Sequence, residues 1–215
     1  ILDFFQTKKK FLNEIKKNKI NLFLKKKFKK SNLKNYDKVL IATYSNNNLI
    51  LSELGIKKLS INKYQLVEKI VIKLPDEYKR KSYVVIDGNF VCVDPFLGTK
   101  YHLLSDVRLS KLETLISKYP NFNSYKKKYL NKGIIKNKKI SNFNKFISNS
   151  SKYLPFLKKA KYVGSMFVVR ALKTKKEKTD ERVTSVNYHN KKIISVFSGK
   201  WNNCIYLAKN LNLKK

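Results

Sequence analysis

The chain has 215 residues, of which 42% are hydrophobic, so it is long enough for one large domain or two small ones with an apolar core. Its longest apolar runs have the length of strands, and none approaches the ~18 residues that a membrane span needs. The first 20 residues lack the continuous apolar stretch of a signal peptide. We therefore expect a cytoplasmic protein without a membrane span.

The net charge of +35 has two interpretations. A strongly basic protein can bind nucleic acid or an anionic membrane surface. However, only four of the 49 basic residues are Arg, the residue that nucleic-acid readers favour, and Asn is over-used at 23 residues. Lys, Asn and Ile share AT-rich codons, and the Lys residues are spread along the whole chain. Compositional bias therefore explains the charge best, and we expect no specific nucleic-acid partner.

The chain contains two Cys and two His residues, and no CxxC pair. Cys92 and Cys204 lie far apart in apolar surroundings, which fits buried thiols in a reducing cytosol. Together with His102 and His189 they do not form a zinc-binding pattern, so we expect no metal.

The first quarter of the chain reads as helix, strand and helix. Residues 1–19 have the apolar spacing of an amphipathic helix, and residues 20–28 read as a short strand ending in a Lys-rich loop. Residues 38–44 form a continuous apolar run, which is typical of a parallel strand buried on both faces. Asn46–Asn48 offer a cap for a short helix over residues 49–54, which Gly55 ends.

The middle of the chain predicts an antiparallel meander. Residues 64–74 alternate apolar and polar side chains over a long stretch. Residues 83–86 and 90–93 read as two strands joined by the turn at 87–89, in which Gly supplies a positive φ. Residues 101–104 read as the next strand.

The second half predicts broken helices and then more strands. The expected helices are 109–119, ended by Pro120, then 143–157, and finally 201–211; the expected strands are 163–172, 183–188 and 193–197. The turn Ser198-Gly199-Lys200 leads from the last strand into the last helix, an arrangement that can hold an anion or a cofactor.

Five segments, taken in order, resemble the flavoproteins of the D-amino-acid-oxidase type. The segments are Tyr36–Tyr44, Ser82–Phe90 with Asp94-Pro95, Val168–Arg170, Thr179–Arg182 and Ile194–Lys200. In that family, the first is a late strand of the FAD domain, the second a substrate-domain hairpin, and the last three are C-terminal blocks. In these blocks an Arg on a strand precedes an Asp-x-Arg turn, and a strand with a Gly turn beside the flavin follows. The order of the whole set carries the resemblance, because no single motif is specific.

The resemblance implies an α+β fold and an FAD-dependent oxidoreductase that oxidises an amine or amino-acid C–N bond by hydride transfer to flavin. Residues 1–57 would be a remnant of the FAD-binding domain and 58–191 the substrate-binding domain. Residues 192–215 would return to the FAD domain as a strand and a helix. Two other functions stay open: a basic nucleic-acid-binding protein, and a non-catalytic interaction domain.

The chain departs from the family in one large way, because no Gly-x-Gly-x-x-Gly turn occurs among its six Gly residues. That turn binds the FAD pyrophosphate. The chain also begins at Ile1 within a helical pattern. We therefore expect a C-terminal fragment that is inactive alone and binds FAD only weakly.

The resemblance also implies particular site residues. Cofactor contacts are expected from Ala42, Thr43, Tyr44, Ser198, Gly199 and Lys200. Lys200 would stabilise the reduced flavin near its N1–C2=O edge. Arg170 would hold a substrate carboxylate by a bidentate pair, with a structural ion pair as the alternative.

Three aromatic side chains of the meander, Tyr83, Tyr101 and His102, would line the substrate pocket. The alternative for them is a place in the core. Arg182 would fix a turn through Asp180. The resemblance designates no acid or base residue.

Overall fold

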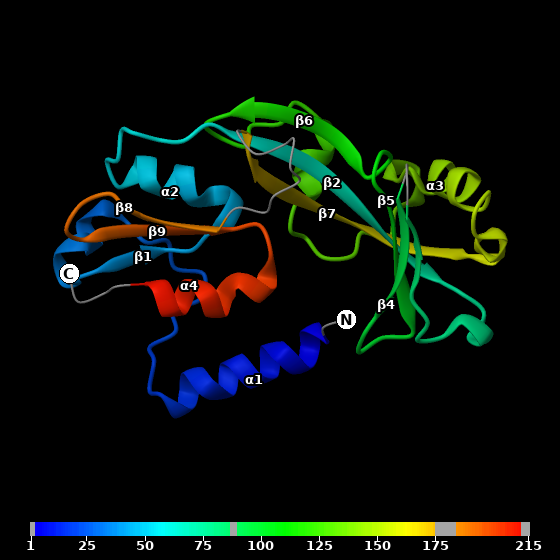
Figure 1. The fold of residues 1–215 in the computed structure, drawn as a ribbon, viewed down its shortest axis with the longest axis horizontal. Helices are drawn as coiled ribbons and strands as arrows, with labels where there is room; N and C mark the ends of the chain where they lie inside the picture. Colours follow the sequence, from blue (N-terminus) through cyan, green and yellow to red (C-terminus); the bar gives the residue numbers. More distant parts are fainter. Residues whose placement is uncertain (1–2, 87–89, 175–183, 212–215) are drawn as a thin grey trace. The chain divides into compact units, whose positions relative to one another are not determined.

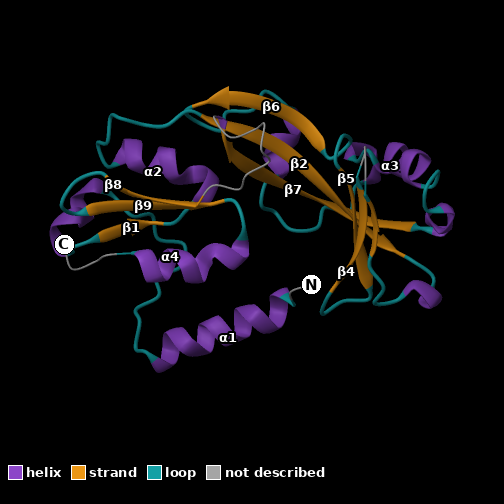
Figure 2. Ribbon diagram, in the orientation of Figure 1, coloured by secondary structure: helices purple, strands orange, loops and turns teal. Residues whose placement is uncertain are grey.

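The computed structural model describes residues 3–86, 90–174 and 184–211. Helices and two sheets are combined as in an α+β protein, which confirms the predicted fold class (Figures 1 and 2). The chain divides into two compact units. The first unit contains residues 1–25, 66–112 and 123–168, and the second contains 26–65, 113–122 and 169–215.

The predicted N-terminal helix is confirmed as α1, Phe4–Lys17, in the first unit. Asp3 caps it, since its side chain accepts a hydrogen bond from the Gln6 amide at 3.0 Å. The ring of Phe5 lies against Gly98, where an added Cβ would clash with it. The helix is therefore held at the turn that precedes strand β5, Tyr101–Asp106.

The strand predicted over residues 20–28 is wrong. These residues form turns and irregular backbone, and the apolar side chains of Leu22, Phe23 and Leu24 are exposed. A short apolar run becomes a strand only where a neighbouring strand completes its backbone hydrogen bonds. None of the described strands pairs with this segment.

The predicted meander is confirmed. Strands β3 (Tyr83–Val85), β4 (Val91–Phe96) and β5 (Tyr101–Asp106) pair antiparallel in sequence order. Strand β2 (Asn62–Lys73) then pairs antiparallel with β5. The hairpin turn at 87–89 lies outside the described residues. The full sheet has the order β3-β4-β5-β2-β6, where β6 is Lys111–Ser117, and strand β7 (Lys161–Lys173) also pairs with β2.

The helix predicted over residues 109–119 is wrong, because this segment forms strand β6, Lys111–Ser117. The carboxyl group of Asp106 accepts hydrogen bonds from the amides of Arg108 and Leu109, both at 2.9 Å. This Asx-type turn reverses the chain directly after β5. The reversed segment meets β2, where the Glu68 amide donates to the Ser110 carbonyl at 2.9 Å. Sheet pairing thus overrides a helical spacing of Leu and Ile residues.

The helix predicted over residues 143–157 is shorter than expected. Helix α3 covers Phe143–Ser150, and a 3₁₀ turn covers Pro155–Lys159. Pro155 cannot donate a backbone hydrogen bond, so it starts a new turn. Strand β7, Lys161–Lys173, follows, longer than the predicted 163–172. The core of this unit includes Ile70, Val93, Leu104, Phe146 and Leu157.

The second unit contains a three-stranded sheet of order β1-β9-β8. Strand β1 (Val39–Ile41) runs parallel to β9 (Ile193–Ser198), and β8 (Thr184–Tyr188) pairs antiparallel with β9. The predicted parallel strand and its expected neighbour, more than 150 positions away, are therefore confirmed. The expected burial on both faces is wrong, because the strand covers only residues 39–41 of the run 38–44 and Leu40 is 43% exposed.

Two helices lie on opposite sides of this sheet (Figure 1). Helix α2, Asn47–Glu53, follows β1, and Gly55 ends it with a φ of +91°, as predicted. Helix α4, Cys204–Asn210, follows β9 after a 3₁₀ turn at Trp201–Asn203. The buried core beside α2 consists of Ile41, Leu51, Leu54 and Ile193.

The compact units have other bounds than the predicted domains 1–57, 58–191 and 192–215. Residues 1–25 belong to the unit with the meander, and residues 169–191 belong to the unit with β1. The interpretation of these parts as FAD-binding and substrate-binding domains stays a prediction. No described helix is long and apolar enough to cross a bilayer.

Candidate functional site

Five of the six predicted cofactor residues line one pocket in the second unit. The pocket, here the β9–α4 pocket, has a volume of about 410 Å³ and is lined by Ala42, Tyr44, Ser198, Gly199 and Lys200 together with residues of α4. Strands β1 and β9 are parallel, so the chain leaves both at the same edge of the sheet. This is why segments far apart in the sequence meet here.

The turn after β9 is held by a single side chain. The Ser198 hydroxyl donates to the Lys200 carbonyl at 2.7 Å and accepts from the Lys200 amide at 3.3 Å. Gly199 between them has no side chain, so its backbone is open to a ligand. Trp201 also lines the pocket and is 58% exposed, so the wall is apolar and accessible.

Thr43, the sixth predicted cofactor residue, contacts α2 instead. Its amide and hydroxyl donate to the Asn47 side-chain oxygen at 2.8 and 3.0 Å. The Asn47 amide group in turn donates to the Val196 carbonyl on β9 at 2.7 Å. Asn47 therefore joins β1, α2 and β9, a role that the sequence did not reveal because Asn46–Asn48 resembled a helix cap. Asn46 makes no side-chain cap hydrogen bond.

Tyr44 follows β1 and is held by contacts with β9 and β7. Its φ is +53°, a left-handed conformation, and its ring stacks on Phe197 with centroids 5.5 Å apart. Its hydroxyl donates to the Ala171 carbonyl and accepts from the Ala171 amide, both at 3.0 Å. A strained backbone fixed by tertiary contacts is frequent at functional sites.

Arg170 is on β7 in the second unit. Its guanidinium donates to the Gln65 side-chain oxygen at 3.3 Å. It does not line the β9–α4 pocket. Its expected role in binding a carboxylate stays a prediction, as does its alternative as an ion-pair residue.

The other predicted substrate residues belong to the first unit. Tyr83 packs against the apolar core there, with its ring centroid 4.7 Å from that of Phe156. The strand register places His102 on the same sheet face as Tyr83 and places Tyr101 on the opposite face. The three side chains therefore do not line one face.

His102 is buried, at 3% exposure. Burial lowers the pKa of its imidazole, although the backbone of Tyr78 and Lys81 opposes this shift. Neither ring nitrogen makes a hydrogen bond of normal geometry with the described residues. Arg182 and Asp180 lie outside the described residues.

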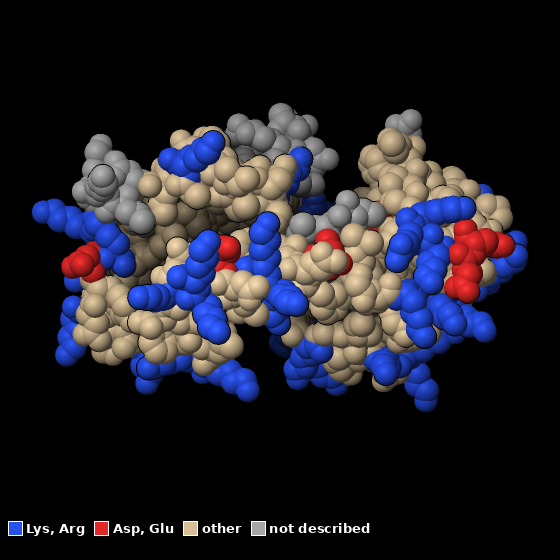
Figure 3. Space-filling view, turned by 90° about the horizontal axis from the view of Figure 1, so that it is seen from below, with Lys and Arg blue, Asp and Glu red and all other residues tan. Residues whose placement is uncertain are grey.

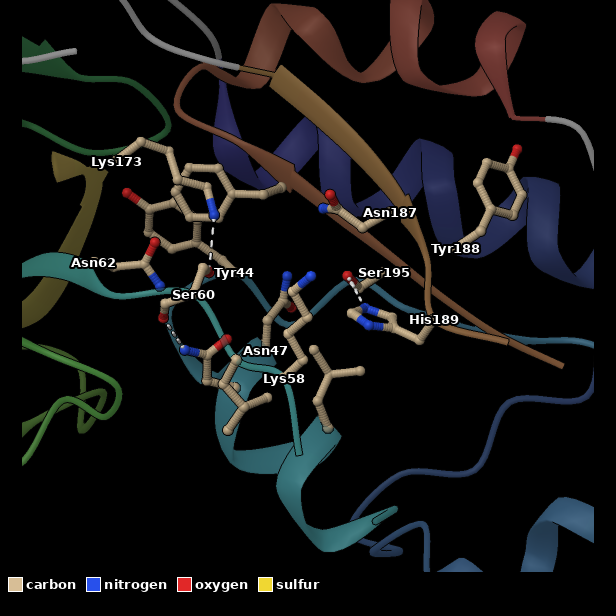
Figure 4. Close-up of a pocket in the computed structure, with 14 residues that line it drawn as sticks. Tyr44, Asn47, Lys58, Ser60, Asn62, Lys173, Asn187, Tyr188, His189 and Ser195 are labelled. Carbon is tan, nitrogen blue, oxygen red and sulfur yellow. Dashed lines mark hydrogen bonds between the residues drawn. The ribbon is translucent and has the colours of Figure 1, made fainter. Parts of the chain in front are cut away.

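A second pocket lies on the other face of the three-stranded sheet, beside α2 (Figure 4). Successive side chains of β9 face the two pockets in turn. Ser195 and Phe197 line this pocket, and Val196 and Ser198 line the β9–α4 pocket. This α2–β8 pocket has a volume of about 420 Å³. Its polar lining includes Lys58, Ser60, Asn62, Lys173, His189 and Ser195. The sequence did not predict this pocket.

Among the described residues, no group of three or more His, Cys, Asp or Glu side chains is placed to bind a metal ion. Cys92 and Cys204 are free thiols, but the expected burial of both is wrong, because Cys92 is partly exposed and Cys204 is exposed. Lys and Arg side chains occur at many places on the face drawn in Figure 3, among few acidic ones.

No family model matches the chain. No curated protein matches it either. Among solved structures, it is similar to the glycine oxidase from Geobacillus kaustophilus, with 10% sequence identity and a TM-score of 0.46. The match covers 77% of this chain and 37% of the oxidase, so the chain spans well under half of that protein. A likeness this distant carries no argument about function.

Proposed function

We propose that this chain is the C-terminal part of an FAD-dependent oxidoreductase of the D-amino-acid-oxidase type that oxidises an amine or amino-acid C–N bond. The observation that carries the proposal is the parallel pairing of β1 with β9. The family resemblance assigns cofactor contacts to both strand ends, and five of those six residues line the β9–α4 pocket.

The β9–α4 pocket suits the ring end of a flavin. Ala42, Val196 and Trp201 offer apolar walls, and the volume lies in the range of about 300–1,000 Å³ that is usual for small-molecule sites. Gly199 allows a planar ring to approach the backbone. Bound flavin would supply the hydride acceptor. The described residues offer no counterpart to the glycine-rich pyrophosphate loop.

The roles of individual residues follow from electrostatics. Lys200 is exposed at the pocket, where its ammonium group would stabilise negative charge on a reduced ring. Arg170 would pair with the carboxylate of an amino-acid substrate, because an unpaired carboxylate in a dry cleft is costly. The donor hydrogen bond to Gln65 orients the guanidinium for such a role.

The flavin proposal is tested on the protein at its natural length. The purified protein should show the absorption bands of bound flavin, and the Gly199→Leu variant should lose them because a side chain fills the pocket. Lys200→Gln should weaken flavin binding or shift its reduction potential downward. Lys209→Gln is the matched control, since Lys209 is exposed on α4 and does not line the pocket.

Two results would overturn this proposal. One is a natural-length protein that carries no flavin and takes up none from solution. The other is a folded Gly199→Leu variant that retains its full flavin content. Residues 1–215 alone are expected to bind FAD weakly, because they lack the pyrophosphate-binding turn.

The nucleic-acid alternative has its own test. Because the net charge is +35, weak binding to DNA at low salt is expected for any function. Tight binding to DNA at about 0.15 M salt would favour the alternative, as would one continuous basic groove lined with aromatic side chains.

A further inference from the structure

The α2–β8 pocket has the composition of an anion site. Two ammonium groups line it, those of Lys58 and Lys173. Among the described residues, no Asp or Glu lines this pocket, and neither ammonium group has an ion-pair partner. The pocket therefore carries positive charge that the described side chains do not neutralise.

Lys173 is held in place inside this pocket. Its ammonium group donates to the Ser60 hydroxyl at 3.2 Å and lies 4.8 Å from the centroid of the Phe197 ring. Burial lowers the pKa of this Lys, which means that the protein environment disfavours its charge. A negatively charged ligand would offset that cost.

Asn62 provides a second, independent observation. This residue is 5% exposed, and its amide group donates to the Tyr64 hydroxyl at 3.1 Å. Its side-chain oxygen is buried and has no hydrogen-bond partner among the described residues. A buried acceptor without a donor costs about 1–3 kcal/mol. A ligand with a hydroxyl or N–H group would satisfy it.

The opposite wall of the pocket is also polar, and two of its side chains contact each other (Figure 4). The His189 ring nitrogen Nε2 and the Ser195 hydroxyl are 2.8 Å apart. Burial lowers the pKa of His189, so its imidazole is neutral near pH 7. In Figure 4, Lys173, Ser60 and Asn62 lie on one side of the pocket, and His189 and Ser195 lie on the other.

We propose that the α2–β8 pocket binds a small organic oxyanion that also carries a hydroxyl or N–H donor. Lys173 and Lys58 bind the oxyanion, and the Asn62 oxygen accepts the hydrogen bond from the donor. The site is separate from the flavin proposal, because it lies on the other face of the β1-β9-β8 sheet and shares only Tyr44 with the β9–α4 pocket. It exists whether or not the protein binds flavin.

The experiment is isothermal titration calorimetry of the natural-length protein with matched pairs of compounds. Ribose 5-phosphate is compared with ribose, and lactate with propane-1,2-diol, so that phosphate esters and carboxylates are tested separately. Inorganic sulfate, which carries no O–H group near neutral pH, tests for an anion that lacks the donor. At least one organic anion should bind, its uncharged partner should not, and sulfate should bind at least about tenfold more weakly than the best anion.

Three variants locate the binding. Lys173→Gln should weaken the best anion at least about tenfold, which corresponds to about 1.4 kcal/mol. Asn62→Asp keeps the size of the side chain and should abolish binding by repulsion. Lys57→Gln is the control, because Lys57 is exposed, does not line the pocket and loses the same charge. Circular dichroism checks that each variant is folded.

Several outcomes overturn the proposal. If neither organic anion binds more tightly than its uncharged partner, the pocket is not an anion site. If Lys57→Gln weakens binding as much as Lys173→Gln, the binding is non-specific attraction to a basic protein. If inorganic sulfate, which has no O–H group, binds as tightly as the best organic anion, the Asn62 oxygen does not accept a hydrogen bond from the ligand. If Lys173→Gln is unfolded, the Asn62→Asp and Lys57→Gln variants still decide between these results.

Discussion

Glu68 is a fully buried carboxyl group on β2 in the first unit, and it allows a quantitative prediction about stability. Its Oε1 atom accepts hydrogen bonds from the hydroxyls of Ser141 and Ser165, both at 2.6 Å. Its Oε2 atom accepts from the Asn142 amide at 3.2 Å. These three bonds tie β2 to β7 and to the residues immediately before α3. The side chain therefore holds the segment that α3 needs in order to pack on the core.

The expected cost of removing it follows from these contacts. A hydrogen bond contributes about 0.5–1.5 kcal/mol net, or about 1.5–3 kcal/mol when one partner is charged. Glu68→Ala removes three such bonds and creates a cavity at a fully buried position, so we expect a loss of about 3–5 kcal/mol. Glu68→Gln keeps one acceptor oxygen but replaces the other with a donor, so we expect about 1–3 kcal/mol.

The assay is urea unfolding followed by far-ultraviolet circular dichroism, in which the midpoint and the slope are both compared. The control is the same Glu-to-Gln change at Glu77, which is exposed and should alter the free energy of unfolding by less than about 0.5 kcal/mol. The reasoning is refuted if Glu68→Ala loses less than about 1 kcal/mol at an unchanged slope, or if it is no less stable than Glu68→Gln.

Three further predictions concern other residues. Gly164→Ala should destabilise the protein by about 1–3 kcal/mol in the same urea assay, since an added Cβ would clash with the Ile134 side chain; unchanged stability would contradict this packing. The pKa of buried His102 is lowered from 6.5, so the unfolded state takes up its proton first and stability should fall as the pH drops below about 6.5 towards the lower pKa of the folded state. Urea midpoints measured across this range should show a slope that His102→Gln reduces, and an equal slope in both proteins would exclude His102 as its source. Finally, Arg170→Lys in the natural-length enzyme should keep the fold but lower kcat/KM at least several-fold for a carboxylate substrate, and should spare an amine that lacks the carboxylate; a variant that unfolds instead would make Arg170 structural.

Local pattern was sufficient for much of the fold. The continuous apolar run that contains β1, the hairpin of β3 and β4, and the Gly55 helix end were all predicted correctly. Each depends on residues close in the chain: a continuous apolar run, a short turn between two strands, and a glycine with a positive φ. The burial of β1 on both faces was not predicted correctly, because Leu40 is exposed. The neighbourhood of β1 and β9 was also predicted, but from the order of the resembling segments.

Other features depended on contacts that no local window contains. Residues 111–117 became strand β6 because the Asp106 turn placed them beside β2, although their apolar spacing also fits a helix. Residues 20–28 stayed irregular because none of the described strands pairs with them. The secondary structure of a short apolar segment is decided by the partner that satisfies its backbone.

The two pockets also differ in how far the sequence predicted them. From the sequence, the family resemblance pointed to five residues that line the β9–α4 pocket, because two recognisable strand ends carry them, while Val196, Trp201, Cys204 and Leu207 were not predicted. That these residues contact a cofactor stays a prediction. Only the tertiary structure revealed the α2–β8 pocket, which combines Asn62, Lys173 and His189 from three distant segments. Lys and Asn are the commonplace residues of this chain, so nothing in the sequence distinguishes the few that are buried. Removal from water makes an unpaired ammonium group or amide oxygen costly in free energy. A ligand that pairs with such a group offsets this cost, and only the tertiary structure decides which groups are removed from water.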